Sequence, residues 1–156
     1  MAAAPAVSAG ADGVPRLRHA AAAGMVSLPL HWLWEMAQMP AYRELQTASW
    51  SATAARCLGA SLGDVAVTAS IVWLTLAVTR EPGMARGVLM QLLALVAAVA
   101  IERIALAAGR WSYTSRMVMV PGLAVGLWPL LQMALLTPLS SAAASRLLGP
   151  RPHTPT

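Results

Sequence analysis

The sequence predicts an all-α polytopic membrane protein in which four transmembrane helices form one bundle. Hydrophobic residues make up 58% of the chain and charged residues only 11%, whereas roughly a quarter of an ordinary soluble domain is charged. Apolar stretches of about 20 residues, enough to cross a hydrocarbon core of about 30 Å, occur four times. They cover approximately residues 21–42, 60–78, 87–109 and 117–140.

These stretches leave room for a single domain in 156 residues. We expect residues 21–140 to form the transmembrane domain, with short loops between the helices. Residues 1–20 carry two prolines and two glycines among alanines, a composition that predicts a disordered N-terminal arm. Residues 141–156 then form a C-terminal tail, and an even number of crossings places both termini on one side of the membrane.

The 11 basic residues are all arginine and give the chain a net charge of +5. They form no long basic run, so they are interpreted as anchors at lipid headgroups, and no nucleic-acid partner is predicted. Arginines are more numerous in the N-terminal arm, second loop and tail than in the first and third loops, which predicts cytoplasmic termini by the positive-inside rule. The absence of lysine, asparagine and phenylalanine is typical of a high-GC bacterium, so the predicted location is the bacterial inner membrane.

Three carboxylates, Glu35, Asp64 and Glu102, lie within the apolar stretches and are half of the six acidic residues. A charged side chain near the centre of a bilayer costs about 2.5–3.5 kcal/mol on insertion scales. Such residues usually face the interior of a helix bundle and have a function there. The order of the stretches places all three acids in the same half of the membrane, which predicts one polar site.

The first stretch carries a polar stripe formed by His31, Glu35, Gln38 and Tyr42, at spacings of four, seven and eleven residues from the histidine. In a helix of 3.6 residues per turn these side chains share one face. The stripe predicts a site with an ionisable pair. It is also compatible with a ladder of hydrogen bonds that only attaches this helix to its neighbours.

Two further stretches add polar residues to the predicted site. Asp64 follows Gly63, where a ligand or another backbone can approach closely, although an aspartate near a helix start can also be an N-cap. Gln132 lies in the fourth stretch and either faces the cavity or makes an interhelical hydrogen bond. Gly122 and Gly126 of the same stretch have the spacing of a close helix contact.

The loop that follows the third stretch contains Arg110, Trp111 and Tyr113. These residues come directly after the helix that carries Glu102, so they are predicted to form a lid above this carboxylate. Arg110 is expected to pair with Glu102.

The polar pattern consists of His31, Trp34, Glu35, Gln38, Pro40 and Tyr42, then Gly63 and Asp64, then Glu102, Gly109, Arg110, Trp111 and Tyr113, and finally Gly126, Leu127, Pro129, Leu130 and Gln132. Over about residues 25–140 it resembles a group of short four-helix bacterial inner-membrane proteins, which implies a fold and a location but no activity. More distantly, the pattern is similar to the EXPERA superfamily of sterol isomerases and the sigma-2 receptor. That similarity implies acid/base and cation-stabilising roles for His31, Glu35 and Glu102.

A carboxylic acid among apolar and aromatic side chains can act as a general acid toward an alkene or epoxide, and a tryptophan face can stabilise the resulting carbocation. The sequence therefore favours an isomerase or cyclase acting on a lipid or isoprenoid that enters from the membrane. The predicted catalytic residues are His31, Glu35, Asp64 and Glu102. The predicted substrate-binding residues are Trp34, Gln38, Tyr42, Arg110, Trp111, Tyr113 and Gln132.

Two other classes of protein stay open. A proton-coupled carrier or channel would use the same acids as a relay, but a chain of this size would have to form at least a homodimer. An accessory subunit of a membrane complex would need no site. No metal and no cofactor are predicted, because the methionines are ordinary core residues and only His31 is a well-placed nitrogen ligand.

Overall fold

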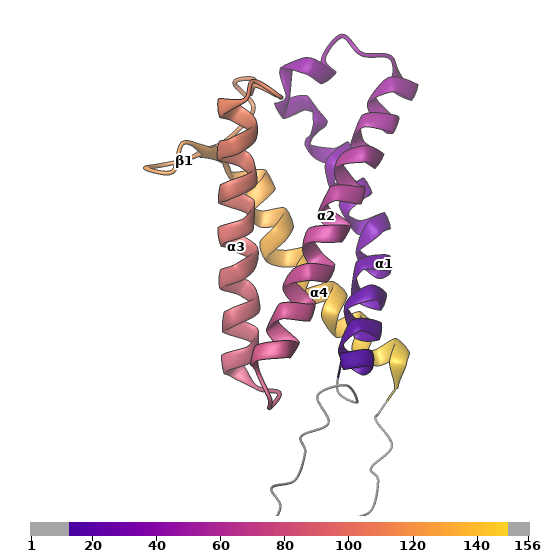
Figure 1. Cartoon of the computed structure of the whole chain (residues 1–156). Helices are drawn as coiled ribbons and strands as arrows, with labels where there is room; N and C mark the ends of the chain where they lie inside the picture. The colour runs from indigo at the N-terminus through magenta and orange to yellow at the C-terminus, as the bar shows by residue number, and fades with distance from the viewer. Residues whose placement is uncertain (1–12, 150–156) are drawn as a thin grey trace, which may run out of the picture.

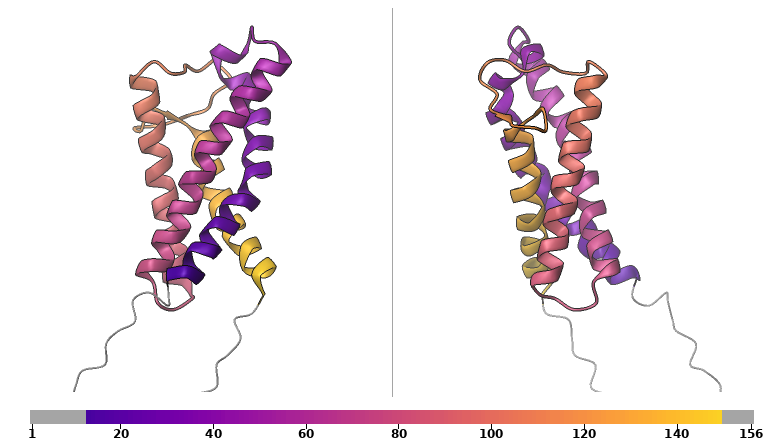
Figure 2. Two further views of the ribbon diagram at one scale, coloured as in Figure 1. Left: turned by 45° about the vertical axis from the view of Figure 1, so that its right-hand side comes forward. Right: turned by 90° about the vertical axis from the view of Figure 1, so that its left-hand side faces the viewer.

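The computed structural model describes residues 13–149, which form a bundle of helices standing side by side (Figure 1). The four α-helices are α1 (Gly13–Gln38), α2 (Trp50–Val78), α3 (Met84–Ala107) and α4 (Leu127–Leu148). The described chain begins and ends at one end of the bundle, here called the terminal end (Figure 2). Residues 39–49 and 108–126 lie at the opposite end, here called the loop end.

Three of the helices, α2, α3 and α4, are long and apolar enough to cross a membrane, with mean hydropathies of 1.7, 2.0 and 1.2. Helix α1 has 26 residues, which is a sufficient length at about 1.5 Å per residue. Its polar stripe lowers its mean hydropathy, so α1 is not among the three candidate membrane spans. The membrane crossing of α1 is therefore a proposal, which is supported by its close packing between α2 and α4.

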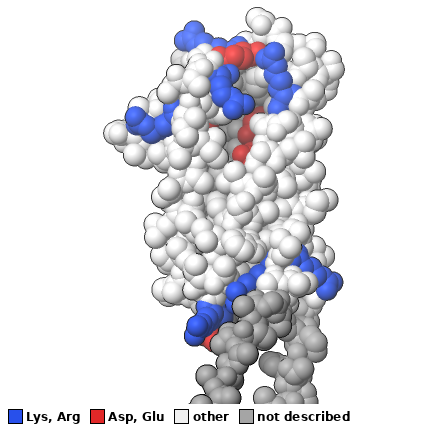
Figure 3. Space-filling view, viewed as in Figure 1, with Lys and Arg blue, Asp and Glu red and all other residues white. Residues whose placement is uncertain are grey.

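The outer surface of the bundle agrees with a membrane location. Large apolar side chains such as Leu74, Val96 and Leu135 are exposed on the outward faces of α2, α3 and α4. In the space-filling view, arginines gather at the two ends and leave an uncharged belt between them (Figure 3). This distribution is the one expected when lipid tails surround the middle of a bundle and headgroups surround its ends.

The first and last helices of the chain, α1 and α4, extend beyond their predicted limits. Helix α1 begins at Gly13, so residues 13–20 are helical and the prediction of a disordered arm is wrong for them; residues 1–12 lie outside the described part. Helix α4 continues to Leu148, so residues 141–148 belong to the bundle and not to a tail. The two extensions contact each other, since His19 Nε2 lies 3.2 Å from Ser141 Oγ. Hydropathy did not find them because they carry polar residues.

Helix α2 begins ten residues earlier than the apolar stretch indicated, at Trp50. Its N-cap is Ser49, whose Oγ accepts a hydrogen bond from the backbone N–H of Ala52 at 3.3 Å. Asp64 therefore lies well inside the helix, and the alternative that it is an N-cap is wrong.

The fourth predicted stretch is wrong over residues 117–126, because a β-hairpin precedes the helix there. Strands β1 (Met119–Val120) and β2 (Val125–Gly126) pair antiparallel. Gly122 adopts a φ of +78° in the turn between them, a conformation that favours glycine. Gly122 and Gly126 thus do not form a helix contact face. An apolar strand and an apolar helix start have the same hydropathy, so the pattern did not separate them.

Small side chains bring α1 and α2 close together at their centre. A Cβ atom placed on Gly24 would lie 3.2 Å from the Cβ of Ala69. Ala20, Ala23 and Val72 are buried in the same core. The close approach of these helices positions His31 of α1 directly against α2.

Candidate functional site

A cavity of about 750 Å³ lies near the loop end of the bundle, within the size range of small-molecule sites. Its walls come from all four α-helices and from the loops that close the loop end. Glu35 of α1, Asp64 of α2 and Glu102 of α3 all line it. The three carboxylates from three helices are thus brought to one place, as the order of the apolar stretches indicated.

The cavity opens on the side of the bundle between α2 and α3. Gly59, Ala60 and Gly63 of α2 and Ile101 of α3 line it and are exposed. A Cβ atom placed on Gly59 or Gly63 would meet nothing within 4 Å. Figure 3 shows the hollow, with acidic side chains in its depth and basic ones around it. The opening lies between apolar helices, and its rim at the loop end also carries exposed charged side chains.

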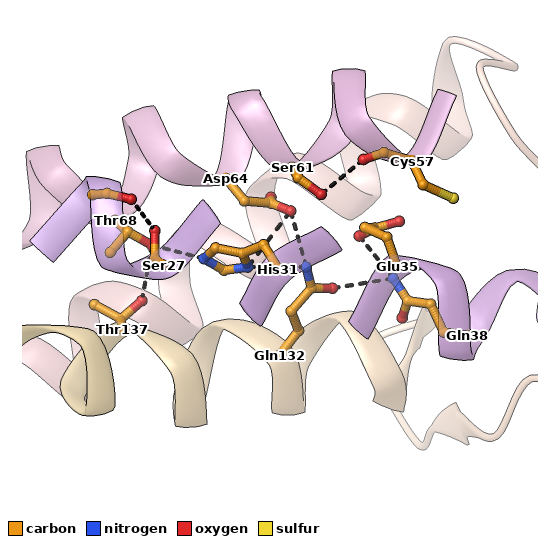
Figure 4. Close-up of polar contacts among 11 residues, drawn as sticks. Ser27, His31, Glu35, Gln38, Cys57, Ser61, Asp64, Thr68, Gln132 and Thr137 are labelled. Carbon is orange, nitrogen blue, oxygen red and sulfur yellow. Dashed lines mark hydrogen bonds and ion pairs between the residues drawn. The ribbon is translucent and has the colours of Figure 1, made fainter. Parts of the chain in front are cut away.

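Gln132 of α4 is at the centre of the polar contacts below the cavity (Figure 4). Its Nε2 donates to Asp64 Oδ2 at 2.9 Å and contacts His31 Nδ1 at 3.1 Å. Its Oε1 accepts a hydrogen bond from Gln38 Nε2 at 3.1 Å. The Nε2 atom of Gln38 also donates a hydrogen bond to Glu35 Oε1 at 2.8 Å. One amide therefore connects α1, α2 and α4 and places two of the carboxylates.

His31 lies just below the cavity and does not line it. The residue is completely buried, with Nε2 3.1 Å from Thr68 Oγ1 and Nδ1 3.7 Å from Asp64 Oδ2. Because the amide of Gln132 donates to Nδ1, the ring proton is on Nε2 and is donated to Thr68. His31 therefore contacts the site through Asp64 and Gln132.

The polar stripe of α1 makes the interhelical hydrogen bonds that its spacing allowed, and part of it also lines the cavity. His31, Glu35 and Gln38 point into the bundle and form a hydrogen-bonded ladder with α2 and α4, while Glu35 and Gln38 also line the cavity. Helix α1 ends at Gln38. Tyr42 follows the 3₁₀ turn η1 (Met39–Ala41) and lines the cavity from the loop end.

Glu102 is held on the opposite wall by aromatic residues. Its Oε2 accepts hydrogen bonds from the hydroxyl of Tyr113, through a very short contact, and from Trp111 Nε1 at 3.3 Å. The hydroxyl of Tyr113 in turn accepts a hydrogen bond from the backbone N–H of Gly126 at 3.1 Å. The carboxylate is only 4% exposed.

The predicted pair between Arg110 and Glu102 is wrong, since no ion pair joins them in residues 13–149. Arg110 is exposed and lines the mouth of the cavity. The cause is the path of the backbone. Tyr42 and Tyr113 form an antiparallel bridge, flanked by the bond from Thr114 N to Ala41 O at 2.9 Å, and this pairing turns the aromatic side chains toward Glu102.

Tyr42 completes an aromatic cluster at this end of the cavity. Its ring contacts the rings of Trp111 and Tyr113 edge to face, with centroids 6.3 and 5.6 Å apart. Burial raises the pKa of Tyr42 strongly, and the nearby Glu102, Glu35 and Asp64 add to the shift. The phenol is therefore neutral at any physiological pH.

Two predicted substrate-binding residues do not reach the cavity wall. Trp34 points to another side of α1, where its ring contacts Trp128 at 6.4 Å and lines a separate hollow of about 250 Å³. It lies one residue, or about 100° around a helix, from Glu35. Tyr113 lies behind Glu102 and positions it. Gln38, Tyr42, Arg110, Trp111 and Gln132 do line the cavity.

The sequence interpretation missed Arg56 and Cys57, which line the cavity from the first turns of α2, and Glu44, which lies at its mouth. Glu44 is in η2 (Arg43–Leu45) and accepts a hydrogen bond from Ser112 Oγ at 2.8 Å. Slight burial opposes ionisation of Glu44, but hydrogen bonds from its own backbone and from Ser112, with the charge of Arg43, lower its pKa overall. The sequence signal that could have placed Arg56 and Cys57 on α2 is Ser49, a residue type that favours an N-cap and marks the true start of the helix.

Comparison with family models, with curated proteins and with solved structures gives no match to this chain. In residues 13–149, no group of three or more histidine, cysteine, aspartate or glutamate side chains is arranged to hold a metal ion.

The hydroxyl of Tyr113 offers a first test, because it joins Glu102 to the hairpin. We predict that Tyr113→Phe lowers the melting temperature of the detergent-solubilised protein, since a buried carboxylate loses a donor and a backbone N–H loses an acceptor, at about 1–3 kcal/mol per group. Tyr42→Phe is the matched control, as the Tyr42 hydroxyl has no hydrogen-bond partner among the described residues. Equal melting temperatures for the two variants would contradict this role of Tyr113.

Proposed function

We propose that this protein is an integral membrane enzyme of the isomerase or cyclase type, which acts on a lipid or isoprenoid by acid/base chemistry. The observation that carries the proposal is the cavity itself. It has the volume of a small-molecule site, it is lined by carboxylates from three helices, and it opens sideways between two apolar helices. An apolar substrate dissolved in the membrane can reach this opening without crossing water.

The two walls of the cavity support separate roles for the acids. On one wall, Glu35 accepts a hydrogen bond from Gln38 and Asp64 accepts one from Gln132. Glu102 lies on the other wall and is held by Trp111 and Tyr113. A carboxyl group on one wall can add a proton to one carbon of an alkene. A carboxylate on the other wall can remove a proton from a neighbouring carbon, which moves the double bond with no net gain or loss of atoms.

The aromatic cluster supports the cationic intermediate of this reaction. Trp111 and Tyr42 both line the cavity next to Glu102, and the faces of aromatic rings attract positive charge. In the proposed bacterial inner membrane, the arginine distribution would place the terminal end toward the cytoplasm. The cavity would then open in the outer half of the membrane.

A proton-coupled carrier or channel is the second candidate. The observation in its favour is the chain of contacts that continues from Asp64 through His31 to Thr68. A carrier needs a sealed membrane and a gradient, whereas the enzyme needs neither, so the two candidates are separable by experiment.

The enzyme proposal is tested with purified protein in nanodiscs incubated with a bacterial lipid extract in D₂O. Protonation of an alkene by a carboxyl group places solvent deuterium on carbon, which mass spectrometry detects even when the product has the mass of the substrate. We predict labelled lipid species with the wild type and a loss of about 10²-fold or more for Glu35→Gln, which keeps the shape and hydrogen bonding of the side chain.

The matched control is Glu44→Gln, which changes an exposed carboxylate at the mouth of the same cavity and should retain labelling. Undiminished labelling with Glu35→Gln would remove this residue from the chemistry. No labelling with the wild type, together with gradient-driven solute movement in liposomes that Glu35→Gln abolishes, would favour the carrier.

The sideways opening is tested by Gly63→Leu. The new side chain would extend into the cavity mouth, where a Cβ atom on Gly63 meets nothing within 4 Å. We predict that it prevents photo-crosslinking of a diazirine-bearing isoprenoid alcohol to peptides of α2 and α3, while the melting temperature is unchanged or higher because glycine is a poor helix former.

Gly87→Leu is the control for this variant. Gly87 lies on α3 at the terminal end, is equally unobstructed, and does not line the cavity. Crosslinking that survives Gly63→Leu at the level of Gly87→Leu would show that the probe does not enter through this opening.

A further inference from the structure

Polar side chains continue below the cavity toward the terminal end, along the interface of α1, α2 and α4. Six of them are completely buried, and they are here called the polar seam: Ser27, His31, Thr68, Thr75, Thr137 and Ser140. Figure 4 shows that Ser27, His31, Thr68 and Thr137 meet between the three helices. The seam is therefore continuous with the site but is not part of its wall.

Helix packing alone does not account for the seam. A buried hydroxyl is costly in apolar surroundings unless it is hydrogen-bonded, and valine would fill the place of threonine without this cost. Helix α3 illustrates the difference, because apart from Glu102 its buried residues are Met90, Ala94, Ala98 and Ala105. The polar residues are thus confined to the three helices that surround His31.

The first part of the seam is a chain of contacts. Asp64 Oδ2 at the cavity wall lies 3.7 Å from His31 Nδ1, and His31 Nε2 lies 3.1 Å from Thr68 Oγ1. Thr68 Oγ1 then lies 3.5 Å from Thr137 Oγ1 on α4. Three side chains thus lead from the cavity into the middle of the bundle.

The second part leads to the surface at the terminal end. Thr75 Oγ1 and Ser140 Oγ are buried and have no hydrogen-bond partner among the described residues, so each is available to a water molecule. Ser140 and Ser141 follow Thr137 by one turn of α4, about 5.4 Å. Ser141 Oγ contacts His19 Nε2 at 3.2 Å, and His19 is only partly buried near the start of α1.

We propose that the polar seam is a proton path that connects the carboxylates of the cavity with the terminal end of the bundle, and that His31 is its central relay. The titratable groups beside this relay are Asp64 from α2 and Glu35 from α1 itself; α4 contributes Gln132 and Thr137, which carry no charge. The path does not depend on the proposed isomerase chemistry, because it concerns where protons travel and not what they react with.

The transfer can be written from the observed hydrogen bonds. A proton leaving the carboxyl group of Asp64 binds His31 Nδ1, after Gln132 moves aside and the gap closes by about half an ångström to hydrogen-bond range. The ring then releases its Nε2 proton to the Thr68 hydroxyl, whose own proton passes to Thr137. Thr137 in turn releases its hydroxyl proton to a water molecule that the unpartnered hydroxyl of Ser140 would hold. One proton leaves the seam for each that enters, and the reverse sequence carries protons toward the cavity.

The experiment measures proton uptake by liposomes that contain the full-length protein and a pH-sensitive dye, driven by a potassium gradient with valinomycin. We expect uptake above that of protein-free liposomes for the wild type. His31→Gln keeps a buried hydrogen-bonding side chain but cannot carry a proton, and Thr137→Val keeps the shape but lacks the hydroxyl. Both should reduce uptake to the protein-free level, while Thr137→Ser, which restores a hydroxyl, should retain it.

Ser70→Ala is the matched control and should conduct like the wild type. Ser70 is exposed on α2, and within residues 13–149 its hydroxyl bonds only the Ala66 carbonyl. Wild-type uptake equal to that of protein-free liposomes would overturn the proposal. So would wild-type uptake in both His31→Gln and Thr137→Val, which would make the seam an interhelical attachment only. Because no lipid is converted in this assay, its failure is distinct from a failure of deuterium labelling.

Discussion

The structure depends on the amide of Gln132, which provides hydrogen bonds where three helices meet in apolar surroundings. A polar side chain in such a place must find partners among other side chains, because neither water nor lipid tails supply them. Gln132 contacts His31, Asp64 and Gln38, and Gln38 holds Glu35. This one residue therefore decides the rotation of α1, α2 and α4 about their axes and the direction in which two carboxylates point.

The cavity forms on the side of the bundle where the hydrogen-bond network around Gln132 ends. Helix α3 contributes no side chain to this network and contacts the other helices through alanines and methionine. Near the loop end α2 and α3 diverge (Figure 1), and the space between them is lined by small residues such as Gly63 and Ala98. Glu102 is fixed across this space by the aromatic residues of the loop. The polar network thus makes one wall rigid, and the loop supplies the other.

Much of this arrangement could be predicted from the sequence, because burial of charge and helical periodicity restrict where polar side chains can lie. Charged residues inside apolar helices must face inward, so Glu35, Asp64 and Glu102 were expected together, and helical spacing aligned Gln38 with Glu35. Other features depended on backbone geometry that hydropathy does not report. The early start of α2 brought Arg56 and Cys57 to the cavity, the hairpin replaced the expected helix start near Gly122, and strand pairing at Tyr113 placed aromatic residues, not Arg110, against Glu102.

The central role of Gln132 is tested most directly by a double-mutant cycle for unfolding in detergent, with Gln132→Leu, Asp64→Leu and the double variant. We predict a coupling of about 1 kcal/mol or more, above the roughly 0.6 kcal/mol average of interhelical hydrogen bonds in membranes, with the double variant less destabilised than the sum of the single variants. A second cycle with Gln132→Leu and Glu102→Gln should be additive, because these residues make no hydrogen bond to each other in the described chain. Additivity in the first cycle would contradict the account.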